Sequence, residues 1–199
     1  MVIDKLFPNG LEDKHQNFTT TSKRFKEDLY LAIQNLLPDH KVLNAVEYGT
    51  HKGQTTRVLA DLFNRVFTFN LPNHFDSAKE LNRDMTNIEY LGLDLYNSDV
   101  YECLIDEQIS LFFIDAVHSY DAVMSDFTRS LNVGQPLPDN CYFVFDDYGA
   151  WPEVKQSVND LIWVEKLQEI QYIGYEPGYD FGSGRKLHDW EGIICKLIN

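Results

Sequence analysis

Short apolar runs alternate along this chain with longer segments in which apolar residues recur every three or four positions. The short runs predict β-strands, and the longer segments predict amphipathic helices. We expect strands over 42–48, 65–70, 88–91, 110–115, 141–146, 168–174 and 190–197. We expect helices over 21–37, 55–63, 76–84, 99–104, 120–131 and 153–163. Residues 1–18 are expected to be irregular, with a turn at Pro8-Asn9-Gly10.

Repeated alternation of strand and helix predicts a parallel sheet with right-handed crossovers and helices on both faces. The last two predicted strands leave little room for a helix between them, so the final strand is expected to be antiparallel. The expected fold class is therefore α/β, a Rossmann-like, doubly wound sheet of seven mostly parallel strands. We divide the chain into residues 1–40, an arm and helix that would form a lid or a substrate or oligomer contact, and a domain over 41–199.

The composition indicates a folded, intracellular protein. Hydrophobic residues make up 44% of the 199 residues and aromatic residues 14%, which argues against disorder. The net charge of -14 disfavours binding to nucleic acids and to anionic membranes. The N-terminus lacks the pattern of a signal peptide, and no run approaches transmembrane length. Three widely spaced cysteines in apolar contexts, Cys103, Cys141 and Cys195, are expected to be buried free thiols in a reducing compartment, the cytoplasm.

Acidic residues follow two of the predicted strands. The apolar run 111–114 leads to Asp115, His118 follows three residues later, and a second run ends on Asp146 and Asp147. In open α/β sheets, ligands bind at the edge where such strands end. Three carboxylates without a nearby lysine or arginine predict a site for a hard divalent cation such as Mg²⁺. The alternative is that Asp115 caps a helix and that the two adjacent aspartates form a solvated turn.

A glycine-containing turn follows the first predicted strand. Gly49 allows a sharp turn, and Gly53 allows the backbone to approach a ligand closely. The next helix offers the free N–H groups of its first turn to a carboxylate or another anion. Glu47 is placed to accept a hydrogen bond from a ligand ammonium group. The segment is neither the dinucleotide-binding fingerprint nor a Walker motif, and a purely structural turn remains the alternative.

Three motifs together resemble a known enzyme class. E-x-G-T-x-x-G-x-T-T, F-I-D-A-x-H-x-Y and F-D-D-Y occur in this order and at this spacing in the class I S-adenosylmethionine-dependent methyltransferases, which this chain resembles. More narrowly, the chain is similar to the metal-dependent O-methyltransferases, in particular the group of macrolide sugar O-methyltransferases of the macrocin and mycinamicin type. The resemblance covers about residues 42–164.

The resemblance implies a set of residues that contact the methyl donor. The glycine turn would wrap the methionine moiety, and Asp94 would contact the adenine amino group. Asn70 stands where the family usually has an acid that holds the ribose, and as a neutral group it should hold the ribose less strongly. The residues implied to bind S-adenosylmethionine are Glu47, Gly49, Thr50, Gly53, Thr55, Asn70, Asp94 and Asp115.

The resemblance also implies the catalytic groups. Asp115, Asp146 and Asp147 fall on the metal ligands, and His118 falls on the general base, a role that suits an imidazole near neutral pH. The expected activity is metal-dependent O-methylation of a hydroxyl on a small molecule or sugar. Three aromatic residues near the same sheet edge are candidates for the acceptor wall: Tyr120, Tyr148 and Trp151.

Two other functions are compatible with parts of this pattern. A metal-dependent hydrolase would use the acidic cluster, but it would leave the glycine turn without a role. A catalytically inactive protein that binds S-adenosylmethionine would fit the neutral Asn70, but it would not need His118 and the acids. Homo-oligomerisation through the N-terminal helix is a further possibility, and the identity of the acceptor cannot be read from the fold.

Overall fold

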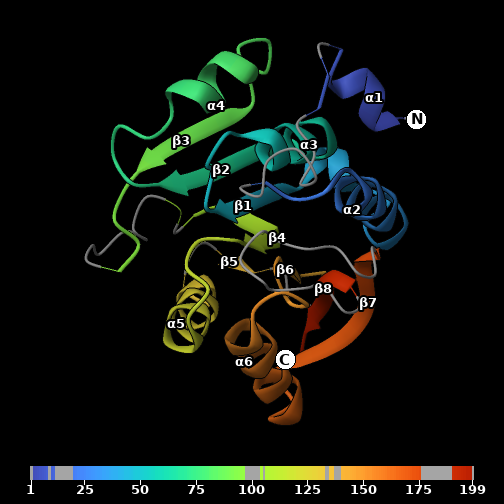
Figure 1. Cartoon of the computed structure of the whole chain (residues 1–199), viewed down its shortest axis with the longest axis vertical. Helices are drawn as coiled ribbons and strands as arrows, with labels where there is room; N and C mark the ends of the chain where they lie inside the picture. The colour runs from blue at the N-terminus through green and yellow to red at the C-terminus, as the bar shows by residue number, and fades with distance from the viewer. Residues whose placement is uncertain are drawn as a thin grey trace.

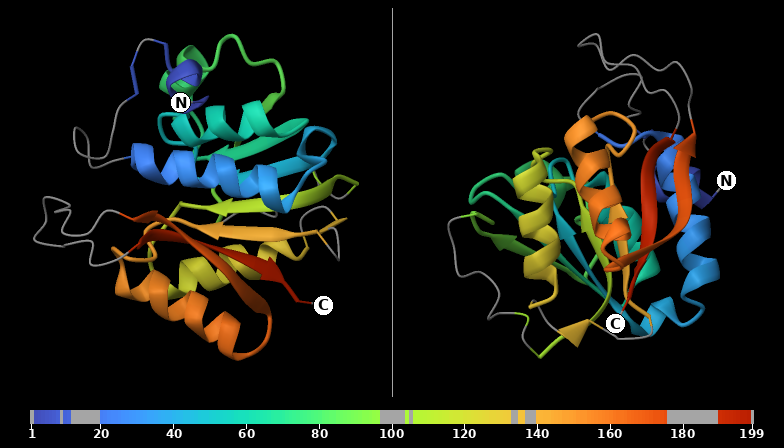
Figure 2. Two further views of the ribbon diagram at one scale, coloured as in Figure 1. Left: turned by 90° about the vertical axis from the view of Figure 1, so that its right-hand side faces the viewer. Right: turned by 90° about the horizontal axis from the view of Figure 1, so that it is seen from below.

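The computed structural model describes residues 2–8, 10–11, 20–96, 104, 106–132, 135–136, 140–175 and 190–198. Within this part the chain forms one mixed sheet between two layers of helices (Figures 1 and 2). The strands are β1 (Asn44–Tyr48), β2 (Arg65–Asn70), β3 (Ile88–Gly92), β4 (Gln108–Ile114), β5 (Gln135–Pro136), β6 (Tyr142–Phe145), β7 (Leu167–Tyr175) and β8 (Trp190–Leu197). The helices are α1 (Val2–Leu6), α2 (Lys23–Leu36), α3 (Gln54–Leu62), α4 (Asp76–Leu81), α5 (Tyr120–Ser130) and α6 (Pro152–Trp163), with a 3₁₀ turn, η1, at His40–Val42.

The strand order is β3-β2-β1-β4-β6-β8-β7, with the short β5 paired to β4. The pairs from β3 through β6 are parallel, whereas β8 is antiparallel to both β6 and β7. This confirms the predicted Rossmann-like fold with its antiparallel last strand. All seven predicted strands are present, and β5 is an additional strand of two residues that the apolar pattern did not indicate.

Apolar side chains cover both faces of the sheet, which is why helices lie on both. One core joins α5 and α6 to the sheet through residues such as Phe127, Val158 and Phe143. The other core joins α1, α2 and α3 through residues such as Ile3 and Phe25. Figure 2 shows α5 and α6 on one side of the strands and α2 on the other. The central strands β1, β2, β4 and β6 are therefore buried on both faces, as expected of parallel strands, whereas the edge strands β3 and β7 are partly exposed.

The beginning of the chain differs from the prediction. Residues 2–6 form helix α1 rather than an irregular arm, and Ile3 and Leu6 are buried in the core shared with α2 and α3. A helix of five residues is too short to be stable alone, so packing rather than local sequence determines it. The predicted helix at 99–104 lies outside the described residues, apart from Leu104.

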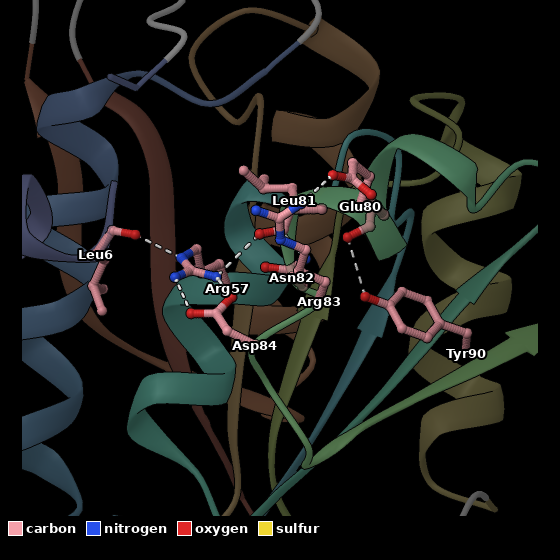
Figure 3. Close-up of polar contacts among 10 residues, drawn as sticks. Leu6, Arg57, Glu80, Leu81, Asn82, Arg83, Asp84 and Tyr90 are labelled. Atoms are coloured by element: carbon pink, nitrogen blue, oxygen red, sulfur yellow. Dashed lines mark hydrogen bonds and ion pairs between the residues drawn. The ribbon is translucent and has the colours of Figure 1, made fainter. Parts of the chain in front are cut away.

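Arg57 connects α1 to the main body of the fold. Its side chain donates hydrogen bonds from α3 to the carbonyl oxygen of Leu6 (2.6 Å) and to that of Leu81 (3.1 Å). It also pairs with both carboxylate oxygens of Asp84 at 2.8 Å, as Figure 3 shows. This hydrogen-bonded pairing lowers the pKa of Asp84 to about 2. One guanidinium group therefore fixes the ends of α1 and α4 against α3.

Two of the predicted buried thiols are confirmed. Cys141 and Cys195 are free and buried, and burial raises the pKa of each thiol to about 12. Cys103 lies outside the described residues. Among the helices of the described part of the chain, none is long and apolar enough to cross a lipid bilayer.

Candidate active site

A pocket of about 710 Å³ lies at the sheet edge where β1, β2, β3 and β4 end. This volume is in the range of pockets that hold a cofactor or a small molecule. Its lining comprises Gly49, His51, Phe69, Asn70, Leu71, His74, Leu93, Asp94, Leu95, Tyr96, Asp115, Ala116, Val117 and His118. Four of the residues predicted to contact the methyl donor are in this lining: Gly49, Asn70, Asp94 and Asp115.

Gly49 closes the turn at the base of the pocket. Its φ is +101°, and a Cβ at this position would lie 2.0 Å from the carbonyl oxygen of Asp115. The Gly49 N–H donates to Phe69 O (3.0 Å), and the Asp115 N–H donates to Tyr48 O (2.9 Å). The end of β1 is thus held between β2 and β4 at a spacing that only glycine permits.

Glu47 lies beneath this turn rather than in the pocket lining. Its side chain is fully buried, and one carboxylate oxygen accepts hydrogen bonds from Thr56 Oγ1 (2.5 Å) and Thr68 Oγ1 (2.6 Å). The other oxygen, Oε1, has no hydrogen-bond partner. Loss of hydration outweighs the two hydroxyl donors and raises the pKa of Glu47 to about 8. The structure therefore places Glu47 in the core beside the site.

The remaining residues of the glycine turn are also outside the lining. Gly53 has a φ of +76°, and a Cβ there would lie 2.7 Å from Ala78 Cβ, so the close approach it permits is to α4. Thr55 Oγ1 lies 3.3 Å from Thr21 Oγ1, which places residues of the N-terminal segment against the first turn of α3. Thr50 is buried and its hydroxyl donates to Phe69 O (3.1 Å). These contacts fix the conformation of the turn beside the pocket.

The polar groups on the opposite side of the pocket are partly engaged by their own loops. Asn70 Oδ1 accepts from the N–H of Leu71 (2.9 Å), and its Nδ2 donates to His74 O (3.3 Å). Asp94 Oδ1 accepts from the N–H of Tyr96 (3.0 Å). His74 and Tyr96 were not among the predicted site residues. Their proximity to the ends of β2 and β3 in the sequence is the signal that could have identified them.

Two aspartates and one histidine come together at one side of the pocket. His118 Nε2 lies 3.4 Å from Asp115 Oδ1 and 3.3 Å from Asp147 Oδ2. One potential ligand atom from each residue lies within 4.8 Å of the others, which is compatible with a bound metal ion. Their side chains are 23%, 27% and 12% exposed for Asp115, His118 and Asp147, so the group is accessible yet shielded.

This group differs from the predicted metal triad in one member. Asp146 is buried and does not belong to the Asp115–His118–Asp147 group. Both aspartates lie in the turn that follows β6, where the direction of each side chain depends on the local backbone angles, so two adjacent aspartates do not automatically reach one ion. Asp147 has a φ of +56°, a left-handed conformation that begins the turn leading to α6. The sequence could not show which of the two would face His118.

Trp151, the residue immediately before α6, supports the cluster. Its N–H donates to Asp147 O (2.9 Å), and its ring lies 5.1 Å from the ring of His118. The other two aromatic candidates contact different residues: Tyr148 donates to Asn159 Oδ1 (2.9 Å), and Tyr120 donates to Asp160 Oδ2 (3.0 Å). Of the three, Trp151 is therefore the one that the structure places against the imidazole.

Comparison with known proteins shows the family to which the chain belongs. A family described as "Methyltransferase domain" matches residues 46–148, which are 103 of the 199 residues and include the turn at Gly49 and the acidic cluster. The chain belongs to the class I S-adenosylmethionine-dependent methyltransferases. No curated protein matches its sequence significantly. Binding of S-adenosylmethionine follows from membership of the family.

Solved structures show the same fold at low sequence identity. The O-methyltransferase TomG from Streptomyces achromogenes, solved with S-adenosylmethionine, has a TM-score of 0.65 at 14% identity, covering 100% of this chain and 88% of its own. The N-methyltransferase NodS from Bradyrhizobium japonicum has a TM-score of 0.62 at 14% identity, covering 89% of this chain and 98% of its own. An rRNA methylase from Streptococcus thermophilus has a TM-score of 0.60 at 13% identity, covering 90% of this chain and 100% of its own. The fold is thus shared by methyltransferases with different acceptors, and the acceptor must be inferred from the site.

Proposed function

We propose that this methyltransferase transfers the methyl group of S-adenosylmethionine to a hydroxyl oxygen of a small molecule or sugar, with a divalent cation as cofactor. The observation that carries the proposal is the group of Asp115, His118 and Asp147 beside the pocket. A neutral amine can attack the methyl group without first losing a proton, whereas a hydroxyl must lose its proton on methylation. Two carboxylates and an imidazole next to the donor pocket suit that requirement.

Asp115 and Asp147 would hold the cation, because carboxylate oxygens are the ligands that suit Mg²⁺. When bound, the cation would acidify and orient the acceptor hydroxyl. His118 would accept the released proton on a ring nitrogen, a role that suits an imidazole. Trp151 packs against the His118 ring and so restricts its orientation. The buried Asp146 would then support the turn that presents Asp147.

The charge of the molecule supports a small acceptor. A net charge of -14 opposes the phosphate backbone of a nucleic acid and an anionic membrane, and it has no such effect on a neutral sugar. The motif pattern that resembles macrolide sugar O-methyltransferases of the macrocin and mycinamicin type points in the same direction. A phenolic or sugar hydroxyl is therefore the proposed acceptor, in a cytoplasmic enzyme. Association of two copies through the 1–40 segment remains a prediction.

The proposal can be tested first by metal binding, which needs no acceptor. Mn²⁺ titration followed by electron paramagnetic resonance should show one site in the wild type, and Asp147→Asn should weaken it at least tenfold. Asp121→Asn, which removes an exposed acid from the first turn of α5, is the matched control and should bind Mn²⁺ as the wild type does. Equal Mn²⁺ affinity of all three proteins would contradict the metal site.

The catalytic role of His118 is tested by turnover. We expect His118→Ala to lower the rate of S-adenosylhomocysteine formation about 10²- to 10⁴-fold with a panel of methyl glycosides and catechol. The affinity for S-adenosylhomocysteine in calorimetry should change less than twofold. His40→Ala, a histidine bonded to the end of α2, is the control. If His118→Ala turned over as fast as the wild type, His118 would not be the base. If the wild type bound S-adenosylhomocysteine but showed no turnover, the inactive cofactor-binding alternative would be favoured.

A further inference from the structure

One wall of the pocket is formed by a side chain that is held at two points. Tyr96 lines the pocket, and its N–H donates to Asp94 Oδ1 (3.0 Å). Its hydroxyl donates to Asp126 Oδ2 (3.1 Å), a residue of α5 that is 30 positions away in the sequence. A side chain anchored at its backbone and at its hydroxyl presents a ring in one orientation. Beside it, Leu93 and Leu95 make the same wall apolar.

The Asp126 side chain reaches Tyr96 from α5. It is fully buried, and its second oxygen, Oδ1, has no hydrogen-bond partner. A buried carboxylate with incomplete hydrogen bonding destabilises a fold, so retaining one calls for a compensating role. Among the described residues, the Tyr96 hydroxyl is the side-chain group that donates a hydrogen bond to the Asp126 carboxylate. The guanidinium of Arg129 lies 5.8 Å from the centre of the Tyr96 ring and stabilises the same arrangement.

The opposite side of the pocket offers only weak hydrogen-bond acceptors to the ribose hydroxyls of a nucleoside. The last residue of β2 is Asn70, which carries no charge, and both polar groups of its side chain bond within the loop to Leu71 and His74. A hydroxyl reaching Asn70 would compete with these bonds. A neutral acceptor also gives a weaker hydrogen bond than a carboxylate. The two sides of the pocket are therefore expected to differ in how strongly each binds a nucleoside.

We propose that this enzyme recognises the nucleoside end of its methyl donor mainly through the base, on a wall formed by Asp94 and Tyr96, with Asp126 as the residue that positions Tyr96. The ribose hydroxyls contribute little to affinity. This inference rests on the proposed function only in that the pocket is the donor site. It assigns Asp126 a positioning role, because it acts through Tyr96 and does not reach the pocket lining.

Calorimetry with S-adenosylhomocysteine tests the wall. Tyr96→Phe keeps the ring and removes its anchor, and we expect its dissociation constant to rise about tenfold. Tyr30→Phe is a matched control, because it removes a tyrosine–aspartate hydrogen bond of the same kind, to Asp61 (2.8 Å), between α2 and α3. It should lower the melting temperature and leave the affinity unchanged. Equal affinity of Tyr96→Phe and wild type would overturn the proposal.

The contrast between base and ribose is tested with a second ligand. The 2′-deoxy analogue of S-adenosylhomocysteine should bind the wild type with less than a threefold loss of affinity. Asn70→Asp, which places an acid at the end of β2, should tighten the parent ligand and restore a penalty for the deoxy analogue. A loss above tenfold for the deoxy analogue in the wild type would show that the ribose is held firmly and would contradict the inference.

The positioning role of Asp126 has its own readout. Asp126→Asn retains an acceptor for the Tyr96 hydroxyl and should bind within threefold of the wild type, whereas Asp126→Ala should match Tyr96→Phe. At saturating donor, kcat should be unchanged, and KM for S-adenosylmethionine should carry the loss. If Asp126→Ala does not fold, Tyr96→Phe still decides the question. If the wild type did not bind S-adenosylhomocysteine, the pocket would not be the donor site. This result differs from those that would contradict recognition of the donor through its adenine base.

Discussion

At the scale of single residues, the carboxyl group of Glu47 is enclosed by β1, β2 and α3. Its partner in the β1–β2 pairing is Thr68, whose hydroxyl donates to it, and Thr56 donates from α3. Removal from water raises the pKa of Glu47 from 4.5 to about 8, and the negative charge of Asp115 acts in the same direction. The protonated carboxyl is therefore the form that the fold prefers near neutral pH.

This shift makes the stability of the enzyme depend on pH. Between about pH 4.5 and 8 the folded state holds a proton that the unfolded state has released, so the free energy of unfolding falls as pH rises. The slope is about 1.4 kcal/mol per pH unit for one such group. Glu47→Gln cannot ionise, and its stability relative to the wild type should increase from pH 5 to pH 8. Urea unfolding at pH 5, 6.5 and 8 measures this.

Asp126, whose burial raises its pKa to about 7, adds a similar slope in both proteins and cancels in the comparison. Parallel stability curves for Glu47→Gln and the wild type would show that Glu47 is ionised in the folded state. A steady relative gain that levels off above pH 8 is the expected pattern. Because Glu47 is outside the pocket lining, donor affinity at a fixed pH should change little.

At the scale of elements, the ends of the strands determine where the chemistry lies. β1, β2, β3 and β4 end around one pocket, and β6 delivers Asp147 next to Asp115 because β4 and β6 are paired in parallel. α1, only five residues long, depends on burial of Ile3 and Leu6 and on the hydrogen bond from Arg57.

Arg57→Ala should release α1 and destabilise the protein. The substitution leaves the carbonyl oxygens of Leu6 and Leu81 without their donor, at an expected loss of about 2–3 kcal/mol in the free energy of unfolding. Hydrogen exchange should rise over residues 2–8 before it rises in the sheet. Asp84→Asn is the matched control, because Asp84 is 61% exposed and exposed ion pairs contribute little. An equal loss in both variants would place the effect in the ion pair instead.

At the scale of the whole molecule, the sequence predicts the architecture more completely than the site. The period of apolar residues determines strand or helix, and this identified all seven longer strands. α1 and β5 were not predicted, because neither segment has a regular spacing of apolar residues. Each depends on contacts formed only in the folded chain. In the site, Asp115 could be predicted from the end of its strand. The choice of Asp147 over Asp146 depends on a backbone angle, and the Tyr96–Asp126 bond joins distant segments, so neither was visible.

The net charge of -14 should couple the stability of the whole molecule to ionic conditions. Like charges repel in the compact state, and salt screens this repulsion, so NaCl should raise the melting temperature from its value at low ionic strength. MgCl₂ at equal ionic strength should raise it further, because an ion that binds only the folded state adds about 2.7 kcal/mol at one hundred times its dissociation constant. Asp147→Asn should lose this excess while keeping the response to NaCl, and Asp121→Asn should keep both. Equal responses to the two salts in the wild type would mean that Mg²⁺ acts only by screening, which would contradict a cation held by Asp115 and Asp147.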